Sequence, residues 1–115
     1  MGISTHILDT HLGRPVTNVA IGLSEFRDNA AGGNWHEIGT ARTDHDGRCK
    51  TLLEGRPLIA TDYKLHFSVG VYFRDQRLAS LYPYVEIVFR VADASQHYHI
   101  PLLLTANGYT TYRGS

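Results

Sequence analysis

Two histidines, His97 and His99, are separated by a single residue near the C-terminus. They stand in residues 97–104, which read His-Tyr-His-Ile-Pro-Leu-Leu-Leu. On a β-strand, alternate side chains point to opposite faces, so both imidazoles share a face with Pro101 and Leu103. The other face carries only large apolar side chains and should be buried: Tyr98, Ile100, Leu102 and Leu104. The histidine face is therefore expected to line a cleft or an interface.

Three interpretations of this histidine pair are open on the residues alone. A His-x-His pair can bind a metal, with His6 as a third ligand, but no Cys, Asp or Glu lies nearby in sequence to complete the site. His97 and His99 are equally typical of ordinary surface histidines. They also suit acid–base catalysis, since an unperturbed imidazole has a pKa of about 6.5.

Two other segments contain candidate functional residues. His6 lies in residues 5–9, where it shares a strand face with Leu8; a lone strand histidine is more often structural or exposed than catalytic. Residues 44–48 read Asp-His-Asp-Gly-Arg, which is typical of a solvated turn with an ion-paired Arg48. This turn is too short for a calcium loop of the EF-hand type, which needs about twelve residues.

The C-terminal residues Tyr112-Arg113-Gly114-Ser115 follow a segment with strand character. Most chain ends fray, so a disordered tail is one interpretation of this segment. An aromatic ring, a guanidinium and an α-carboxylate close together could equally line a polar pocket.

The elements that must position these residues are short strands. Turn signals rich in Gly, Pro, Asn and Asp recur along the chain, and the runs between them are β-branched and aromatic. This rhythm predicts an all-β sandwich or barrel. One segment, residues 71–80, lacks both alternation and Gly or Pro, and it predicts a short helix that ends before Pro83. The eight predicted strands are 4–9, 19–24, 35–42, 48–53, 63–69, 85–91, 97–104 and 109–113.

The composition of the 115-residue chain sets limits on its function. A hydrophobic fraction of 43% predicts a folded chain, and the length suits one domain over residues 1–115. A single cysteine excludes an internal disulfide and any multi-cysteine metal cluster. Eleven basic and eleven acidic residues give zero net charge, which disfavours a nucleic-acid partner. No secretory signal or membrane-spanning run is evident, so we expect no membrane partner and a cytoplasmic protein, with the periplasm and peroxisome left open.

Taken together, these segments resemble the 5-hydroxyisourate hydrolases, which are transthyretin-related enzymes of urate breakdown. The His-Tyr-His run and the Tyr-Arg-Gly-Ser ending carry the resemblance most specifically, because transthyretin itself, a thyroid-hormone carrier, lacks both. The resemblance covers essentially the whole chain in order, through residues 5–9, 13–15, 43–48, 63–67, 97–104 and 112–115.

The resemblance implies a fold, an assembly and a reaction. The fold would be a transthyretin-like sandwich of two four-stranded sheets with one short helix near residues 71–80. The assembly would be a homotetramer, a dimer of dimers with active sites in the channel between them. The reaction would be hydrolysis of 5-hydroxyisourate to 2-oxo-4-hydroxy-4-carboxy-5-ureidoimidazoline, with neither a cofactor nor a metal.

The resemblance also implies catalytic roles for His6, Arg48, His99 and Ser115. His6 and His99 would position and deprotonate a water molecule, which would attack directly because no serine or cysteine nucleophile is evident. Arg48 would bind the polar ring oxygens and stabilise the developing negative charge.

The remaining site residues implied by the resemblance lie at the C-terminal end of the chain. Tyr112 and Arg113 would bind the substrate together with His6 and Arg48, and His97 and Gly114 would support the site. The alternative function is that of a carrier, which would bind a small aromatic ligand in the same channel.

Overall fold

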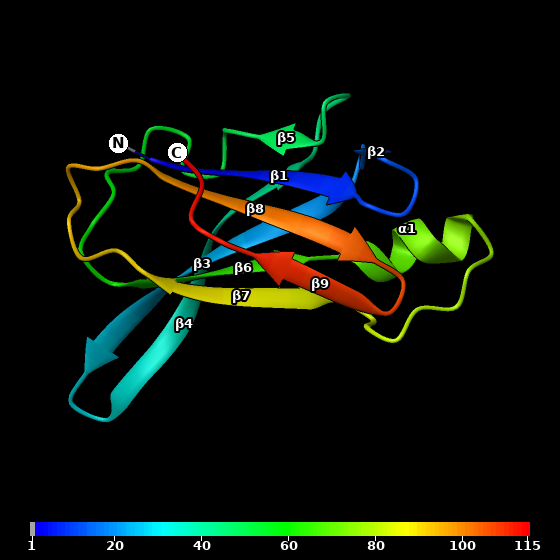
Figure 1. Cartoon of the computed structure of the whole chain (residues 1–115). Coiled ribbons are helices and arrows are strands. Elements are labelled where there is room, and N and C mark those ends of the chain that lie inside the picture. Colours follow the sequence, from blue (N-terminus) through cyan, green and yellow to red (C-terminus); the bar gives the residue numbers. More distant parts are fainter. Residues whose placement is uncertain (1) are drawn as a thin grey trace.

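The computed structural model describes residues 2–115, and it consists of two β-sheets packed face to face with one short helix at one end (Figure 1). Met1, which the predicted domain includes, lies outside the described residues.

The first sheet has the order β2-β1-β8-β9, with β5 also paired to β1, and the second has the order β4-β3-β6-β7. The first sheet contains β1 (Ile3–Asp9), β2 (Arg14–Pro15), β5 (Arg48–Cys49), β8 (Tyr98–Thr105) and β9 (Gly108–Thr111). The second contains β3 (Ala20–Asn29), β4 (Gly32–Arg42), β6 (Asp62–Phe67) and β7 (Val85–Arg90), and the helix is α1 (Val69–Asp75).

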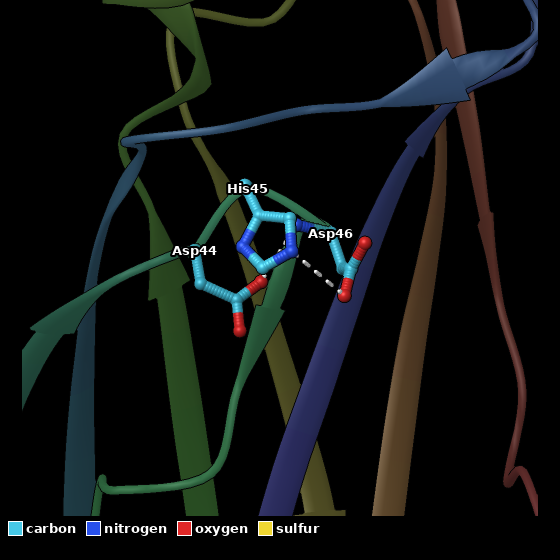
Figure 2. A group of neighbouring side chains, drawn as sticks. All are labelled: Asp44, His45 and Asp46. Atoms are coloured by element: carbon cyan, nitrogen blue, oxygen red, sulfur yellow. Dashed lines mark hydrogen bonds and ion pairs between the residues drawn. The ribbon is translucent and has the colours of Figure 1, made fainter.

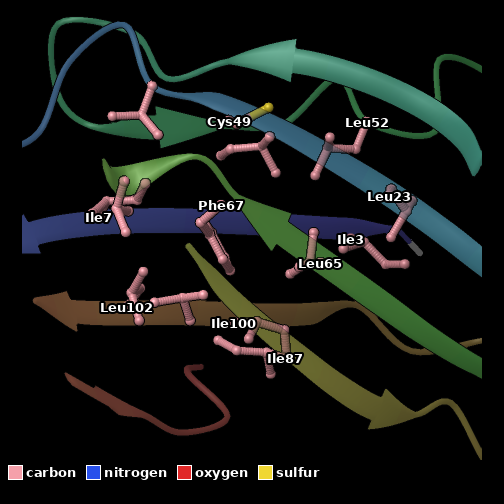
Figure 3. Packing of buried hydrophobic residues seen from close by; sticks show 14 of the residues in the cluster. Ile3, Ile7, Leu23, Cys49, Leu52, Leu65, Phe67, Ile87, Ile100 and Leu102 are labelled. Carbon is pink, nitrogen blue, oxygen red and sulfur yellow. The ribbon is translucent and has the colours of Figure 1, made fainter. Parts of the chain in front are cut away.

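The predicted transthyretin-like sandwich with one short helix is confirmed, but the first sheet has five strands instead of the predicted four, because the two-residue strands β2 and β5 both pair with β1. Between the two sheets lies a single apolar core, and Figure 3 shows side chains from both sheets meeting there. Strand alternation builds this core: Ile3 and Ile7 of β1 point inward, as do Leu65 and Phe67 of β6. Burying such a side chain contributes about 1.5–3 kcal/mol each, so the inward faces of the strands are strongly specified.

The helix begins and ends earlier than predicted, at Val69 and Asp75 instead of residues 71 and 80. Gly70 belongs to its first turn, where its N–H donates to the carbonyl of Pro83 at 3.1 Å. Arg77 adopts a left-handed conformation with φ of 57°, and the N–H of Leu78 then returns to the carbonyl of Phe73. A left-handed residue of this kind ends a helix, whatever the helix propensity of the residues beyond it.

The predicted strand at residues 48–53 is also wrong in length, because β5 contains only Arg48 and Cys49. The chain then leaves the sheet, and Leu52 is buried under β4. A Cβ on Gly39 would lie 2.0 Å from the carbonyl oxygen of Leu52, so this close approach depends on a glycine 13 positions away. Such a long-range contact is not readable from the alternation of residues 48–53.

The helix is fastened to the first sheet by a buried carboxylate. The Tyr72 hydroxyl donates to Asp9 Oδ2 at 2.6 Å, and the N–H groups of His11 and Leu12 donate to Oδ1. Burial alone would raise the pKa of Asp9, but these hydrogen bonds outweigh it and lower the pKa below its usual value. Within the described residues, α1 is too short to cross a membrane.

Candidate active site

The pairing of β1 with β5 and β8 brings three of the predicted catalytic residues onto one face of the first sheet. In the register, His6 lies opposite Arg48, and Ser4 lies opposite His99. Residues two apart share a face, so Ser4, His6, Arg48 and His99 all point away from the core. The residues between them, such as Thr5, are buried in the core. The predicted outward face of residues 97–104 is therefore confirmed for the histidines.

Arg48 is positioned by the turn that precedes it, whose residues Asp44, His45 and Asp46 are drawn in Figure 2. The Asp44 carboxylate accepts the N–H groups of Asp46 at 2.9 Å and of Arg48 at 3.0 Å, and the hydrogen bond from Arg48 is the largest cause that lowers the pKa of Asp44. Gly47 has a φ of 74°, and its carbonyl accepts the N–H of Ile7 at 2.8 Å. Hydrogen bonds within the turn and to β1 therefore fix its conformation and its position.

The same turn contains a group of potential metal ligands, with one atom each from Asp44, His45 and Asp46 within 4.8 Å of one another. All three side chains are exposed, and His45 forms an ion pair with Asp46 at 3.4 Å (Figure 2). The Asp44 carboxylate is already bound to two backbone N–H groups, so its geometry is that of a turn-forming aspartate.

A buried serine, Ser4, joins the two histidines of the His-Tyr-His run. Its Oγ lies 2.8 Å from His97 Nε2 and 2.8 Å from His99 Nδ1. The two rings therefore direct these nitrogens to one hydroxyl. Ser4 was not among the predicted site residues, although its spacing of two residues from His6 places it on the same strand face.

Both histidines of the run favour the neutral form. Burial lowers the pKa of His99, and its electrostatic interactions with the Arg48 guanidinium and with the imidazoles of His6 and His97 lower it further. Burial likewise lowers the pKa of His97. At neutral pH, His99 therefore carries a free ring nitrogen that can accept a proton.

The C-terminal residues form the remaining wall of the site. The N–H of Gly114 donates to the carbonyl of His99 at 2.8 Å, which continues the sheet past the end of β9. A Cβ on Gly114 would lie 2.6 Å from the His99 ring, so only glycine fits against the imidazole here. This tether brings Ser115 into a cavity of about 170 Å³ lined by Ser4, Thr5, Arg48, Lys50, His97, His99 and Ser115.

Tyr112 and Arg113 lie elsewhere within the single chain. They line a separate cavity between the edges of the two sheets, next to β7. The Arg113 guanidinium lies 4.2 Å from the centre of the Tyr98 ring, and it donates to Gln96 Oε1 and to the carbonyl of His97. In the described chain, Arg113 therefore anchors the C-terminal segment. His6 faces the same side as His99 but does not line the cavity, whereas Lys50, which sequence analysis did not single out, does.

The comparison with protein families agrees with this arrangement. A family model described as "Transthyretin: HIUase/Transthyretin family" matches residues 3–114. The chain belongs to the HIUase/Transthyretin family.

Relatives in this family are similar to the chain over nearly its full length. The 5-hydroxyisourate hydrolase of Mus musculus is 42% identical over 98% of this chain and 94% of its own. The enzyme of the same name from Ralstonia nicotianae is 44% identical over 98% of this chain and 97% of its own.

Solved structures of this family have the same fold. The 5-hydroxyisourate hydrolase of Klebsiella pneumoniae aligns over all of both chains with a TM-score of 0.84 and 30% identity. Sea bream transthyretin in complex with thyroxine aligns over 99% of this chain and 95% of its own, with a TM-score of 0.87 and 29% identity. The HIUase/Transthyretin fold therefore accommodates a hydrolase and a hormone-binding protein alike, and the residues of the site must separate the two.

Proposed function

We propose that this chain hydrolyses 5-hydroxyisourate to 2-oxo-4-hydroxy-4-carboxy-5-ureidoimidazoline, a step of urate catabolism. The observation that carries the proposal is a neutral, half-buried His99 in the same small cavity as Arg48 and Ser115. A ring-opening hydrolysis needs a proton acceptor for water and a positive charge for the developing oxyanion. The relatives named 5-hydroxyisourate hydrolase support the same substrate.

In the proposed mechanism, His99 accepts a proton from the water that attacks an amide carbonyl of the substrate, without a covalent intermediate. General base catalysis of this kind contributes roughly 10²–10⁴-fold. His6 lies on the same face and orients the water and the substrate. Arg48 binds the ring oxygens of the substrate and stabilises the negative charge that develops on the carbonyl oxygen. Ser115 completes the cavity beside His99, and in this mechanism its hydroxyl contacts the substrate.

We propose further that the chain is one domain that assembles as a homotetramer, a dimer of dimers. Two observations support an assembly. β7 and β9 are the outermost strands at the same edge of the sandwich, so their free backbone groups are open to pairing with another copy. Val88 and Tyr112, which line the cavity at this edge, remain 57% and 54% exposed. Substrate contacts of Tyr112 and Arg113 would belong to this assembly, since the single chain places them apart from His99.

The alternative is a carrier that binds a small aromatic ligand, as the thyroxine complex of sea bream transthyretin illustrates for this fold. The cavity favours the hydrolase, because it is small and polar and contains cationic side chains, Arg48 and Lys50, beside a histidine that can accept a proton. A carrier of an apolar aromatic ring needs an apolar lining instead.

The test is a direct assay on freshly generated 5-hydroxyisourate, in which the decay of the substrate absorbance and the stereochemistry of the product are both read. The wild-type chain should accelerate the decay, whereas His99→Asn should lose roughly 10²-fold or more in kcat because it removes the base. Native mass spectrometry shows whether the variant assembles like the wild type. Turnover by His99→Asn at the wild-type rate would contradict the assignment of His99.

A further inference from the structure

Ser4 couples the protonation of two imidazole rings. Its side chain is only 6% exposed, and its Oγ lies 2.8 Å from His97 Nε2 and 2.8 Å from His99 Nδ1. A serine hydroxyl has a single proton to donate. When it donates to one ring nitrogen, the second ring must donate to its oxygen for both hydrogen bonds to exist. The tautomer of His97 is therefore set by the tautomer of His99.

Two arrangements satisfy both hydrogen bonds when the Ser4 hydroxyl donates to one of the rings. In the first, His99 Nδ1–H donates to Ser4 and Ser4 donates to His97 Nε2, which leaves His99 Nε2 with a free lone pair. In the second, His97 Nε2–H donates to Ser4 and Ser4 donates to His99 Nδ1, which leaves the proton of His99 on Nε2. The first arrangement makes His99 Nε2 a base, and the second makes it an acid.

His97 lies at the outer end of the hydrogen-bonded series His99–Ser4–His97, and it reaches solvent. His97 is exposed, and it borders both the small site cavity and a second, more open cavity of about 580 Å³. On the side of the second cavity, His97 Nδ1 lies 3.7 Å from the position that a Cβ on Gly2 would take. His97 can therefore exchange a proton with water outside the active site.

The exposure of His97 favours moving a proton out of the site along this path, since His97 is exposed and His99 is half-buried. The side chains around His99 include the basic His6, Arg48 and Lys50; among the described residues that line the cavity no side chain is acidic, and Ser115 brings its α-carboxylate to it. An imidazolium at His99 would be half-buried beside these groups, whereas an imidazolium at His97 faces solvent. The second cavity is lined by Glu54 and by the basic Lys50 and Arg56, so contact with water, and not the charge of this lining, is what accommodates an imidazolium at His97.

We propose that Ser4 relays protons between His99 and His97, so that His97 is the proton reservoir of the reaction; this inference rests on the proposed function. As water attacks, its proton passes to His99 Nε2, the proton on His99 Nδ1 passes to Ser4 Oγ, and the Ser4 proton passes to His97 Nε2. The hydroxide adds to the substrate carbonyl, and His97 becomes the imidazolium. Return of the proton along the same path supplies the ring nitrogen that leaves. Ser4 is thus a positioning and relay residue that does not touch the substrate.

The kinetic test is a double-mutant cycle between Ser4→Ala and His97→Gln. Each single variant should lower kcat roughly 10–100-fold with little change in KM, because proton transfer becomes slower while substrate binding is unchanged. The double variant should be no slower than the slower single variant, since both changes interrupt one path. Ser4→Thr, which keeps the hydroxyl, should recover most of the lost rate. Losses that multiply in the double variant, or a Ser4→Ala variant with wild-type kcat, would overturn the relay.

A second measurement does not depend on turnover. Nuclear magnetic resonance of ¹⁵N-labelled wild-type protein reads which nitrogen of each imidazole carries the proton. At neutral pH, His99 Nδ1 and His97 Nε2 should be in opposite states, one protonated and one not. Two protonated or two bare nitrogens facing Ser4 would overturn the relay even if Ser4→Ala fails to fold. The wild type could fail to hydrolyse 5-hydroxyisourate while His99 Nδ1 and His97 Nε2 are in opposite protonation states. That result would overturn the proposed function but support the coupling of the two histidines through Ser4.

Discussion

His99 is surrounded by groups that oppose its protonation. Burial and the electrostatic interactions with His6, Arg48 and His97 all lower its pKa, so the ring stays neutral to a lower pH than a free imidazole. A neutral His99 is the form that accepts a proton from water. The alternation of residues 97–104 predicted the strand face of His99, whereas its role as the base was implied by the family resemblance and stays a prediction. The sequence could not show how His6 and Arg48 come to lie near His99, because they belong to β1 and β5.

The first prediction concerns the pH dependence of the reaction. Because the base is active when neutral, kcat/KM should fall as the pH drops through a pKa below about 6.5, the value of a free imidazole. Arg48→Met removes one of the charges that lower the pKa of His99. The acid limb of the profile should therefore move to higher pH in this variant, and the profile of kcat/KM between pH 4 and pH 9 measures it.

Arg48→Lys is the matched control, because it keeps the charge while losing the planar guanidinium. It should lower the rate but leave the acid limb near its wild-type position. An acid limb that stays in place in Arg48→Met would show that burial alone sets the pKa of His99.

At the scale of the elements, the turn at residues 44–48 and the C-terminal segment are what place Arg48 and Ser115. The turn was predicted correctly from Asp44 and Gly47, because the preference of Asp and Gly for turns is a local property that can be recognised in the sequence alone. The ends of α1 and β5 were not, because they depend on Arg77 in a left-handed conformation and on the contact of Leu52 with Gly39. Local patterns predict that an element exists more readily than where tertiary contacts make it begin and end.

The second prediction is that Gly47→Ala destabilises the protein by about 1–3 kcal/mol. Gly47 has a φ of 74°, and an added Cβ would lie 2.5 Å from the carbonyl oxygen of Ile7. Gly13→Ala is the matched control, since Gly13 has a φ of 69° and nothing within 4 Å of an added Cβ. Urea unfolding of both variants separates backbone strain from the clash. Equal losses in the two variants would show that the contact with Ile7 relaxes without cost.

The third prediction concerns the C-terminal segment. Deleting residues 113–115 removes the hydrogen bond from Gly114 to His99, the contacts of Arg113 with Gln96 and Tyr98, and the Ser115 wall of the cavity. A misplacement of about 1 Å in an active site can cost roughly 10²-fold in rate, and we expect a loss of this order in kcat/KM.

Ser115→Ala separates the tether from the hydroxyl in this experiment. It keeps the backbone in place and should lose less activity than the deletion. A deletion variant with wild-type steady-state kinetics would show that the C-terminal segment is dispensable.

At the scale of the whole molecule, the outward face of the first sheet is only half closed by the single chain. The site cavity is open on the side away from the core, and Tyr112 points to the free edge of the sandwich instead. A water-excluding site would strengthen the effect of Arg48 on the developing charge. Copies of the same chain are the proposed cover, and no pattern in the sequence itself identifies that contact.

The fourth prediction tests this assembly through the edge strand β7. Val88→Lys places a charge at an edge where strands are open to pairing with another copy. The mass of the native assembly should therefore shift toward that of smaller oligomers or the monomer. Val71→Lys is the control, because Val71 is 47% exposed on α1 and away from this edge. Native mass spectrometry of both variants distinguishes them. An unchanged mass in Val88→Lys would place the contact between copies elsewhere.

The parallel pairing of β1 with β8 has a consequence for how the protein is made. Ser4 and His99 are 95 residues apart in the chain, yet they must meet before the site exists. Contacts of such wide sequence separation form late and slow the folding of β-rich domains. On the ribosome, β1 has no parallel partner until β8 has been synthesised and released from the exit tunnel. A chain terminated between β5 and β8 therefore contains His6 and Arg48 but no active site, and it exposes β1 as an unprotected edge that invites aggregation.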